Sequence, residues 1–479
     1  MPEHGPLAAL TAQAVRAALQ AGQFSAQVYG EALLARCAAF GTLNALAWLE
    51  PEAVLRQARD ADRARAAGEP VGSLAGLPVV VKDNIDTPGF PTSAGNAWLR
   101  SCLPDTAAPV WQALAGQGAI LLGKANMHEL AAGGTSNNPV FGRVGNPVSP
   151  GRIAGGSSGG TAAAIAAGLA PLGLGTDTSG SLRTPASFCG IAALRPTTAG
   201  ERAYSAQGIV PLVAALDTAG PMARSVADLV LLHGAITARS PSMPPAPEGL
   251  RLGVPRSYFW DRLQAPVDQL CRMALGRLQD AGIACIELDL GELAEEAVHW
   301  QIELGRAGRL RDLRAFLAQR LPGVDLREFI GAIRSEDVRA LYLDSPASAQ
   351  AEAPILREHL PRLRRRYQHL LDTHCLDAIA YPCVPVAAPL EAQARGRPDD
   401  VIELHGQSVA LGLALARNAR FAAALGAPAL VLPAGRSEEG LAIGLELAAR
   451  LGDDGRLLAL GQTVEAVLAS HRQKTPKFE

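Results

Sequence analysis

The sequence has little lysine and no excess charge of either sign. Its 44 basic residues include only four lysines, at positions 82, 124, 474 and 477, which leaves 40 arginines. The formal net charge is -2 over 479 residues. A nearly neutral chain has no general attraction for phosphate backbones or anionic lipid surfaces. We therefore expect neither a nucleic acid nor a membrane as a partner.

Patterns typical of disulfide frameworks, metal sites and export are also missing. The seven cysteines are an odd number, widely spaced and without a CxxC pair, which argues for reduced thiols and against a zinc site. The first residues, MPEHGPLAAL, lack the basic stretch and apolar run of a secretory signal. The longest uncharged run, residues 153–176, is about half Gly, Ser, Thr and Pro, a composition unsuited to a membrane helix. A cytoplasmic location is the resulting expectation.

The sequence does contain enough apolar material for one large core. Hydrophobic residues make up 48% of the chain and charged residues 19%, proportions typical of a globular protein. Helix and strand patterns are interspersed without a repeat or linker, so we expect one α/β domain over residues 1–479. The patterns divide it into a helical N-terminal cover (1–70), a catalytic core (71–240), a helix-rich cover with one strand near its start (241–375), and returning core strands with a C-terminal helix (376–479).

Short apolar runs bounded by turn residues predict the strands of this domain. They lie at residues 79–81, 119–122, 171–177, 377–385, 427–435 and 440–447. The segment ANMHEL (125–130) reads as helical, and we interpret its His128 as structural. The basic run Arg362–Arg366 lies among leucines at helical spacing, which indicates a solvated helix face.

Lys82 ends the β-branched run Val79–Val81 in a chain that otherwise uses arginine almost everywhere. Lysine can lose its proton when it is desolvated, whereas arginine in practice cannot. Lys82 is therefore a candidate base. The alternative is that it caps the strand and pairs with Asp83 or a neighbour. Lys124 follows the next strand, and we interpret it as a surface lysine or one that supports the site.

The stretch Gly155–Arg183, GGSSGGTAAAIAAGLAPLGLGTDTSGSLR, carries the main candidate chemistry. Two of its hydroxyls, Ser157 and Ser181, stand among glycines that leave room for a substrate. A glycine-rich turn at a helix N-terminus could instead cradle a phosphate, but the GxxxxGK[ST] and GxGxxG patterns are absent. We interpret both serines as catalytic. The loop at 133–147 is rich in Gly, Asn and Pro and could line a cleft.

Three separated segments resemble the amidase signature family of hydrolases: VKDNIDTPGFPTSAG, GGSSGGTAAAIAAGLAPLGLGTDTSGSLRTPASFCG, and the C-terminal GAPALVLPAG with GLAIGLEL. The resemblance is densest over residues 74–198. It implies one α/β/α domain with a central mixed sheet of about eleven strands flanked by helices. It also implies a Ser, cis-Ser, Lys triad, in which Ser181 is the nucleophile, Ser157 the bridging serine after a cis peptide bond, and Lys82 the base. No metal or organic cofactor is implied.

The resemblance also implies residues that support the triad. They are the oxyanion-hole backbone N–H groups of Thr178, Ser179, Gly180 and Ser181, the substrate contacts at Ser157 and at a carbonyl near Ala131, and the braces Asp177 and Arg183. Ser179 departs from the Gly-Gly that many members have before the nucleophile. A serine fits there only with a negative φ or with backbone strain.

The substrate is indicated by MHELAAGGTSNN (127–138) and VIELHGQSVALGLALARNARF (401–421). They look most similar to the branch that hydrolyses aryl-acetic primary amides such as mandelamide and indoleacetamide. Arg417 and Arg420 could hold an acidic substrate, and we interpret them as surface residues. A glutaminase subunit of a tRNA-dependent amidotransferase, a hydrolase of ureido or allophanate-like amides, and a noncatalytic binding protein stay open. The expected partner is a small amide, and homodimer formation stays open.

Overall fold

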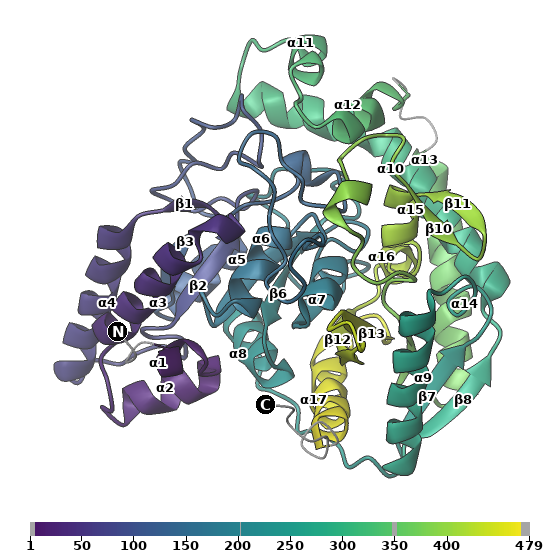
Figure 1. Cartoon of the computed structure of the whole chain (residues 1–479), viewed down its shortest axis with the longest axis horizontal. Coiled ribbons are helices and arrows are strands. Elements are labelled where there is room, and N and C mark those ends of the chain that lie inside the picture. The colour runs from purple at the N-terminus through teal and green to yellow at the C-terminus, as the bar shows by residue number, and fades with distance from the viewer. Residues whose placement is uncertain (1–4, 202, 347–351, 471–479) are drawn as a thin grey trace.

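Strands from most of the chain join one central sheet in the computed structural model, which describes residues 5–201, 203–346 and 352–470 (Figure 1). The strands are β1 (Leu46–Leu49), β2 (Pro78–Lys82), β3 (Ile120–Ala125), β4 (Leu172–Asp177), β5 (Ala192–Arg195), β6 (Thr218–Ala223), β7 (Arg251–Pro255), β8 (Ala284–Leu288), β9 (Ala378–Pro382), β12 (Ala429–Arg436) and β13 (Ala442–Ala448). In these described residues the sheet has eleven strands, in the order β1-β3-β2-β4-β6-β5-β12-β13-β9-β7-β8. A separate hairpin is formed by β10 (Val401–Leu404) and β11 (Gln407–Ala410).

The sheet is mixed. β2 runs parallel to β3 and β4, and β7 runs parallel to β8 and β9, whereas the other neighbours are antiparallel. Figure 1 shows β1, β2 and β3 beside the N-terminal helices at one end of the molecule, and β7 and β8 at the other end. The prediction of a mixed sheet of about eleven strands is confirmed.

Helices cover the sheet in two groups. α6 (Gly159–Ala166) and α7 (Arg183–Cys189) pack against each other and against β4 and β5, respectively. α8 (Val226–Thr237) and α9 (Ala265–Asp280) both pack against α17 (Asp454–Ser470), and these three helices contact β6, β12 and β13. The other helices are α1 (Gly5–Ala8), α2 (Ala12–Gln20), α3 (Ala26–Ala39), α4 (Pro51–Ala66), α5 (Pro109–Gly116), α10 (Gly291–Arg320), α11 (Leu326–Gly331), α12 (Glu336–Leu343), α13 (Glu352–Pro354), α14 (Leu360–Thr373), α15 (Leu411–Ala416) and α16 (Arg420–Leu425).

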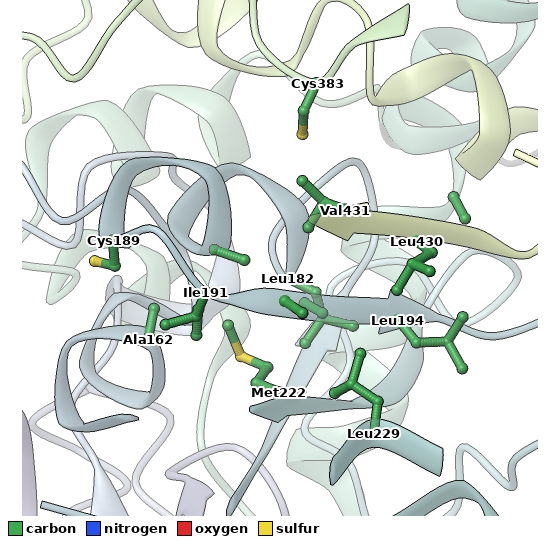
Figure 2. Close-up of a cluster of buried hydrophobic side chains, with 14 of the residues drawn as sticks. Ala162, Leu182, Cys189, Ile191, Leu194, Met222, Leu229, Cys383, Leu430 and Val431 are labelled. Carbon is green, nitrogen blue, oxygen red and sulfur yellow. The ribbon is translucent and has the colours of Figure 1, made fainter. Parts of the chain in front are cut away.

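The apolar core lies directly beneath the turn that carries Ser181. Figure 2 shows Leu182, which directly precedes α7, gathered in one cluster with Leu194, Met222 and Leu430 from β5, β6 and β12, and all four side chains are fully buried. Strands covered on both faces need apolar residues on both sides, as β5 and β12 have. Truncating Leu194 to alanine should cost about 2–5 kcal/mol of unfolding free energy. Because Leu182 follows Ser181, the core fixes the position of the candidate nucleophile.

Some predictions of local structure are wrong. ANMHEL is not a helix, because β3 continues to Ala125 and only a 3-10 turn forms at Glu129–Ala131. The segment 241–375 contributes two sheet strands instead of one, since β8 joins β7 at the edge of the sheet. The basic run at 362–366 does lie on a helix, α14, where Arg366 pairs with Glu296 at 2.9 Å. In the described ranges, no helix combines the length and apolar character needed to span a bilayer.

Candidate active site

Two parallel strands end at the same edge of the sheet and bring candidate residues together. β2 pairs with β4, with Val79 opposite Leu172 and Val81 opposite Leu174. Every residue of both strands is buried, as expected for strands covered on both faces. The end of β2 therefore places Lys82 beside Thr176, inside the protein.

The Lys82 ammonium contacts two hydroxyl groups. Its Nζ lies 2.8 Å from Ser157 Oγ and 2.7 Å from Thr176 Oγ1, and the residue is 0% exposed. The alternative in which Lys82 pairs with Asp83 is wrong, because Asp83 pairs with Lys124 at 3.3 Å. Lys124 is itself fully buried, so the surface interpretation of that residue is also wrong.

The Lys82 amine loses its proton more easily than an ordinary lysine. Burial disfavours the charged form and lowers the pKa of Lys82 from 10.5 to about 7, although Asp177 and Asp217 oppose this change. The groups that the amine contacts are hydroxyls and, at 3.5 Å, the Thr176 carbonyl, none of which carries a charge. Near neutral pH a large fraction of Lys82 is therefore uncharged and can accept a proton.

The turn at the start of α6 links the buried amine to the accessible serine. The peptide bond between Gly156 and Ser157 is cis, and Ser157 is fully buried. The next residue, Ser158, donates its N–H to the Ser181 carbonyl at 3.1 Å, so the two serine-bearing turns lie against each other. Ser181 is partly exposed. Lys82, Ser157 and Ser181 are thus brought to one place from three separate segments of the chain.

A buried ionic network holds the turn before α7. The Asp177 carboxylate accepts hydrogen bonds from the N–H groups of Gly180 and Leu182 at 2.8 and 3.1 Å. It also pairs with Arg183 at 3.1 Å and with Arg195 at 2.9 Å. Burial alone would raise the pKa of Asp177, but the two guanidinium groups hold it well below its ordinary range. Asp177 therefore holds the turn directly, Arg183 supports it through Asp177, and Arg195 completes the network.

The backbone N–H groups of this turn divide into two sets. The N–H of Gly180 is engaged by Asp177, which leaves those of Thr178, Ser179 and Ser181 as candidates for the oxyanion hole. Gly180 has a φ of 125°, a conformation that glycine adopts without strain. Ser179 does not have a positive φ. The serine that replaces the first glycine is therefore accommodated without backbone strain.

A cavity of about 530 Å³ is lined by Ser181 together with Thr178 and Ser179. Ala131, with a φ of 56°, lines it as well, and the predicted cleft loop contributes residues 133–135. Apolar walls come from Leu212, Val213, Ile302, Leu341, Leu411 and Leu415. An organic acyl group therefore fits this cavity. Across the described part of the chain, no cluster of three or more His, Cys, Asp or Glu side chains is placed to hold a metal ion.

Arg420 lies in the wall of this cavity, so its interpretation as a surface residue is wrong. Its Nη1 donates to Gln301 Oε1 at 2.7 Å, and Gln301 Nε2 donates to Ser179 Oγ at 2.7 Å. A guanidinium group can only donate hydrogen bonds, so Arg420 fixes the orientation of the Gln301 amide. Arg417 is partly buried too, with its guanidinium 4.0 Å from the centre of the Tyr258 ring.

Sequence reasoning missed Thr176, Arg195 and Gln301. Arg195 gave a partial signal, because it ends the apolar strand AALR and a buried charge there requires a partner. Thr176 lies within the stretch that was singled out, but its contact with Lys82 depends on the pairing of two strands. Gln301 gave no local signal, since it lies on α10, 122 residues from Ser179 in the sequence. Only the fold brings it to the site.

Comparisons with known proteins identify the family of the chain. Residues 30–458 match the family model for amidases. The chain is 35% identical to mandelamide hydrolase of Pseudomonas putida, over 99% of this chain and 94% of that protein. It is 36% identical to indoleacetamide hydrolase of Agrobacterium vitis, over 91% and 92%. A crystal structure of an amidase matches with a TM-score of 0.83 at 30% identity, over 95% of this chain and 99% of that one. The chain therefore belongs to the amidase signature family, the hydrolases of amide C–N bonds.

Proposed function

We propose that the protein hydrolyses a small primary amide to a carboxylate and ammonia. Ser181 is the nucleophile, and Lys82 is the base that acts through Ser157. The observation that carries this proposal is the 2.8 Å contact between Lys82 Nζ and Ser157 Oγ, two fully buried groups next to the turn of the accessible Ser181. Similarity to mandelamide and indoleacetamide hydrolases supports an aryl-acetic acyl group.

The first half of the reaction forms an acyl-enzyme. A serine hydroxyl is a weak nucleophile until a base removes its proton. Ser157 takes the proton of Ser181 and passes its own proton to neutral Lys82, while Ser181 Oγ bonds to the amide carbon. The backbone N–H groups of Thr178, Ser179 and Ser181 stabilise the resulting oxyanion, and one such donor is typically worth about 10²–10³ in rate. The proton returns through Ser157 to the amide nitrogen, the C–N bond breaks, and ammonia leaves.

The second half of the reaction releases the acid. Water attacks the acyl carbon and gives its proton to Lys82 through Ser157, and the oxyanion again forms at the same backbone N–H groups. The bond to Ser181 Oγ then breaks, and Ser181 recovers a proton by the same path. The sum is one amide and one water converted to one carboxylic acid and one ammonia. An aryl ring has apolar contacts available at Leu212, Ile302 and Leu415.

The test is ammonia release from phenylacetamide, mandelamide and indoleacetamide. Ser181→Ala and Lys82→Ala should each lower kcat by about 10⁴-fold or more, as removal of members of a catalytic unit does. Ser157→Ala should be severely impaired, with some activity left. Ser205→Ala is the control, because Ser205 is also partly exposed but does not line the cavity. Circular dichroism and thermal unfolding should show that the variants are folded.

Two results would contradict the proposal. Retention of more than about a tenth of the wild-type turnover in Lys82→Ala would require another base. Failure of a fluorophosphonate probe to label Ser181 would favour a noncatalytic binding protein. Glutamine hydrolysis that appears only with a partner protein, with all free amides inert, would instead identify a glutaminase subunit. Turnover of ureido amides alone would shift the substrate to that class.

A further inference from the structure

Two arginines in the cavity wall have no carboxylate partner. Arg309, on α10, is 8% exposed, and Arg420, at the start of α16, is partly buried. Both line the cavity that Ser181 opens into. Among the residues that the structure describes, no acidic side chain lies within 4.0 Å of either guanidinium, and the Nε of each is buried without a hydrogen-bond partner. Neither guanidinium is therefore balanced by a contacting carboxylate.

The groups that these arginines do contact are neutral. Arg309 Nη1 donates to the Leu341 carbonyl at 3.1 Å and to Ser345 Oγ at 2.6 Å, and Arg420 Nη1 donates to Gln301. Burial lowers the pKa of Arg309, and burial together with the nearby Arg309 lowers the pKa of Arg420 to about 10. Both groups remain protonated at neutral pH. The cavity thus holds two positive charges that no contacting carboxylate balances.

The other charged residues of the cavity wall differ from these two, because each has a partner. The pairs are Arg306 with Asp344 at 3.7 Å, Arg397 with Glu336 at 3.9 Å, Asp400 with Arg395 at 2.9 Å, and Asp337 with His128 at 3.2 Å. Among the arginines of the cavity wall that the structure describes, Arg309 and Arg420 are therefore the two without a contacting carboxylate.

One face of α10 directs this charge toward the nucleophile turn. Gln301, Gly305 and Arg309 are spaced four residues apart and lie on the same face of the helix. A Cβ at Gly305 would lie 3.6 Å from Arg309 Nη2, so the guanidinium lies back along the helix toward Gln301. Gln301 bridges Arg420 and Ser179. Arg420 Nη1 is therefore no more than about 8 Å from Ser179 Oγ. Ser179 precedes Ser181 by two residues.

We propose that Arg309 and Arg420 bind a carboxylate on the acyl part of the substrate. The preferred substrates are then primary amides that carry a negative charge a few carbon atoms from the scissile amide. This inference rests on the proposed function and specifies the acyl group of its substrate further. An aryl-acetic amide with a carboxylate on its ring has both the aryl-acetic group and the negative charge. Guanidinium groups match the planar carboxylate with parallel N–H donors. A buried unpaired charge is costly, and a substrate anion compensates that cost when it binds.

The test compares amides that are matched in size but differ in charge. 4-Carboxyphenylacetamide is paired with 4-methylphenylacetamide, and the monoamide of glutaric acid with hexanamide. The wild-type kcat/KM should be about tenfold or more higher for the charged member of each pair. Arg420→Met and Arg309→Met should lower it roughly 10- to 100-fold for the charged amide and less than about threefold for the neutral one. Arg272→Met is the control, because Arg272 pairs with Asp268 at 2.8 Å and does not line the cavity, and it should change neither rate by more than about threefold.

Binding and stability measurements separate this role from a structural one. The products 4-carboxyphenylacetate and glutarate should bind in calorimetry and raise the Tm of the wild type, and Arg420→Met should weaken binding by about tenfold or more. Arg420→Lys should keep part of that affinity. Without ligand, Arg420→Met should unfold at the same temperature as the wild type or above it, because an unpaired buried charge is removed. A large drop in Tm would indicate a structural role and overturn the proposal.

The possible failures are distinguishable. If neutral amides are hydrolysed as fast as their charged counterparts, or if Arg420→Met slows both equally, the anion site is refuted while the amidase proposal stands. If no amide is hydrolysed, the proposed function fails. In that case dicarboxylate binding that depends on Arg420 still supports the anion site, whereas absence of binding refutes it.

Discussion

Amide hydrolysis should titrate with Lys82. Burial lowers the pKa of this amine from 10.5 to about 7, and the proposed relay works only when the amine is neutral. For a neutral amide, kcat/KM should then rise with pH through a single ionisation, reaching about a tenth of its plateau at pH 6, half at pH 7 and nine tenths at pH 8. An ordinary lysine would be neutral in only about one molecule in 3000 at pH 7. In the proposed mechanism, the burial of Lys82 therefore makes catalysis effective near neutrality.

The assay is ammonia release between pH 5.5 and 9.5 at constant ionic strength. Asp217 must be separated from Lys82, because burial raises the pKa of that carboxyl to about 6. Its negative charge favours the protonated lysine, so Asp217→Asn should shift the rise of kcat/KM to lower pH. If the rise of kcat/KM with pH disappears in Asp217→Asn, the titrating group is Asp217. A profile that is flat from pH 6 to 9, or a midpoint above about pH 9, would refute Lys82 as the base.

Three stability measurements test the surroundings of the site. Unfolded Lys82 holds its proton up to a pH near 10.5 and the folded form only to about 7, so the cost of burying its charge is fully present below pH 7 and disappears as pH rises to 10.5. The free energy of unfolding in urea should therefore be higher for Lys82→Met than for the wild type, and the difference should be largest below pH 7. A difference that does not depend on pH would contradict this. Arg195→Met should lose about 3–5 kcal/mol, because it strips a partner from buried Asp177, and a loss under about 1 kcal/mol would contradict that pairing. Gly160→Ala places a Cβ against two backbone carbonyls and should lower the unfolding free energy by about 1–3 kcal/mol. Gly276→Ala on α9 has open space and should raise it by about 0.5–1 kcal/mol. Equal effects of the two substitutions would contradict the close packing of α6.

The residues of the proposed triad could be singled out from sequence because their signals are local. Lys82 ends an apolar strand, and Ser157 and Ser181 stand in glycine-rich turns. The eleven-stranded sheet followed from family resemblance and not from periodicity. β6 reads TAGPMA, and its glycine and proline do not predict a strand. β8 is an edge strand with several partly exposed residues. Such strands exist because neighbouring strands pair with them, which no local pattern records.

The acyl side of the cavity could not be predicted for the same reason. Arg420 lies in ARNARF, where an arginine among alanines reads equally well as a solvated helix residue. Its burial depends on α10, because its hydrogen-bond partner Gln301 lies 119 residues earlier in the chain. The cavity walls come from α10, α12, α15 and α16, which are far apart in sequence. Motifs therefore pointed to the proposed catalytic residues, whereas the residues proposed to select the substrate required the fold.

Buried cations with contacting carboxylates have a structural role in this protein. Lys124 pairs with Asp83 at 3.3 Å, and Arg183 pairs with Asp177 at 3.1 Å and with Glu446 at 2.5 Å. In each case the carboxylate favours the protonated form of its partner, although burial still lowers the pKa of Lys124, and the pair occupies the anion site of the cation. Such pairs fix the ends of β2 and β4 on which the site is built.

Lys82, Arg309 and Arg420 belong to another class, because their contacts are neutral. A buried cation without a carboxylate can relieve its cost in two ways: it loses the proton, or it binds an anion from outside. Lysine can take the first route, and only arginine keeps its charge for the second. In the proposed mechanism Lys82 accepts a proton, and in the proposed anion site the two arginines meet the acyl group. The choice between lysine and arginine at these positions thus assigns one to proton transfer and the others to substrate recognition.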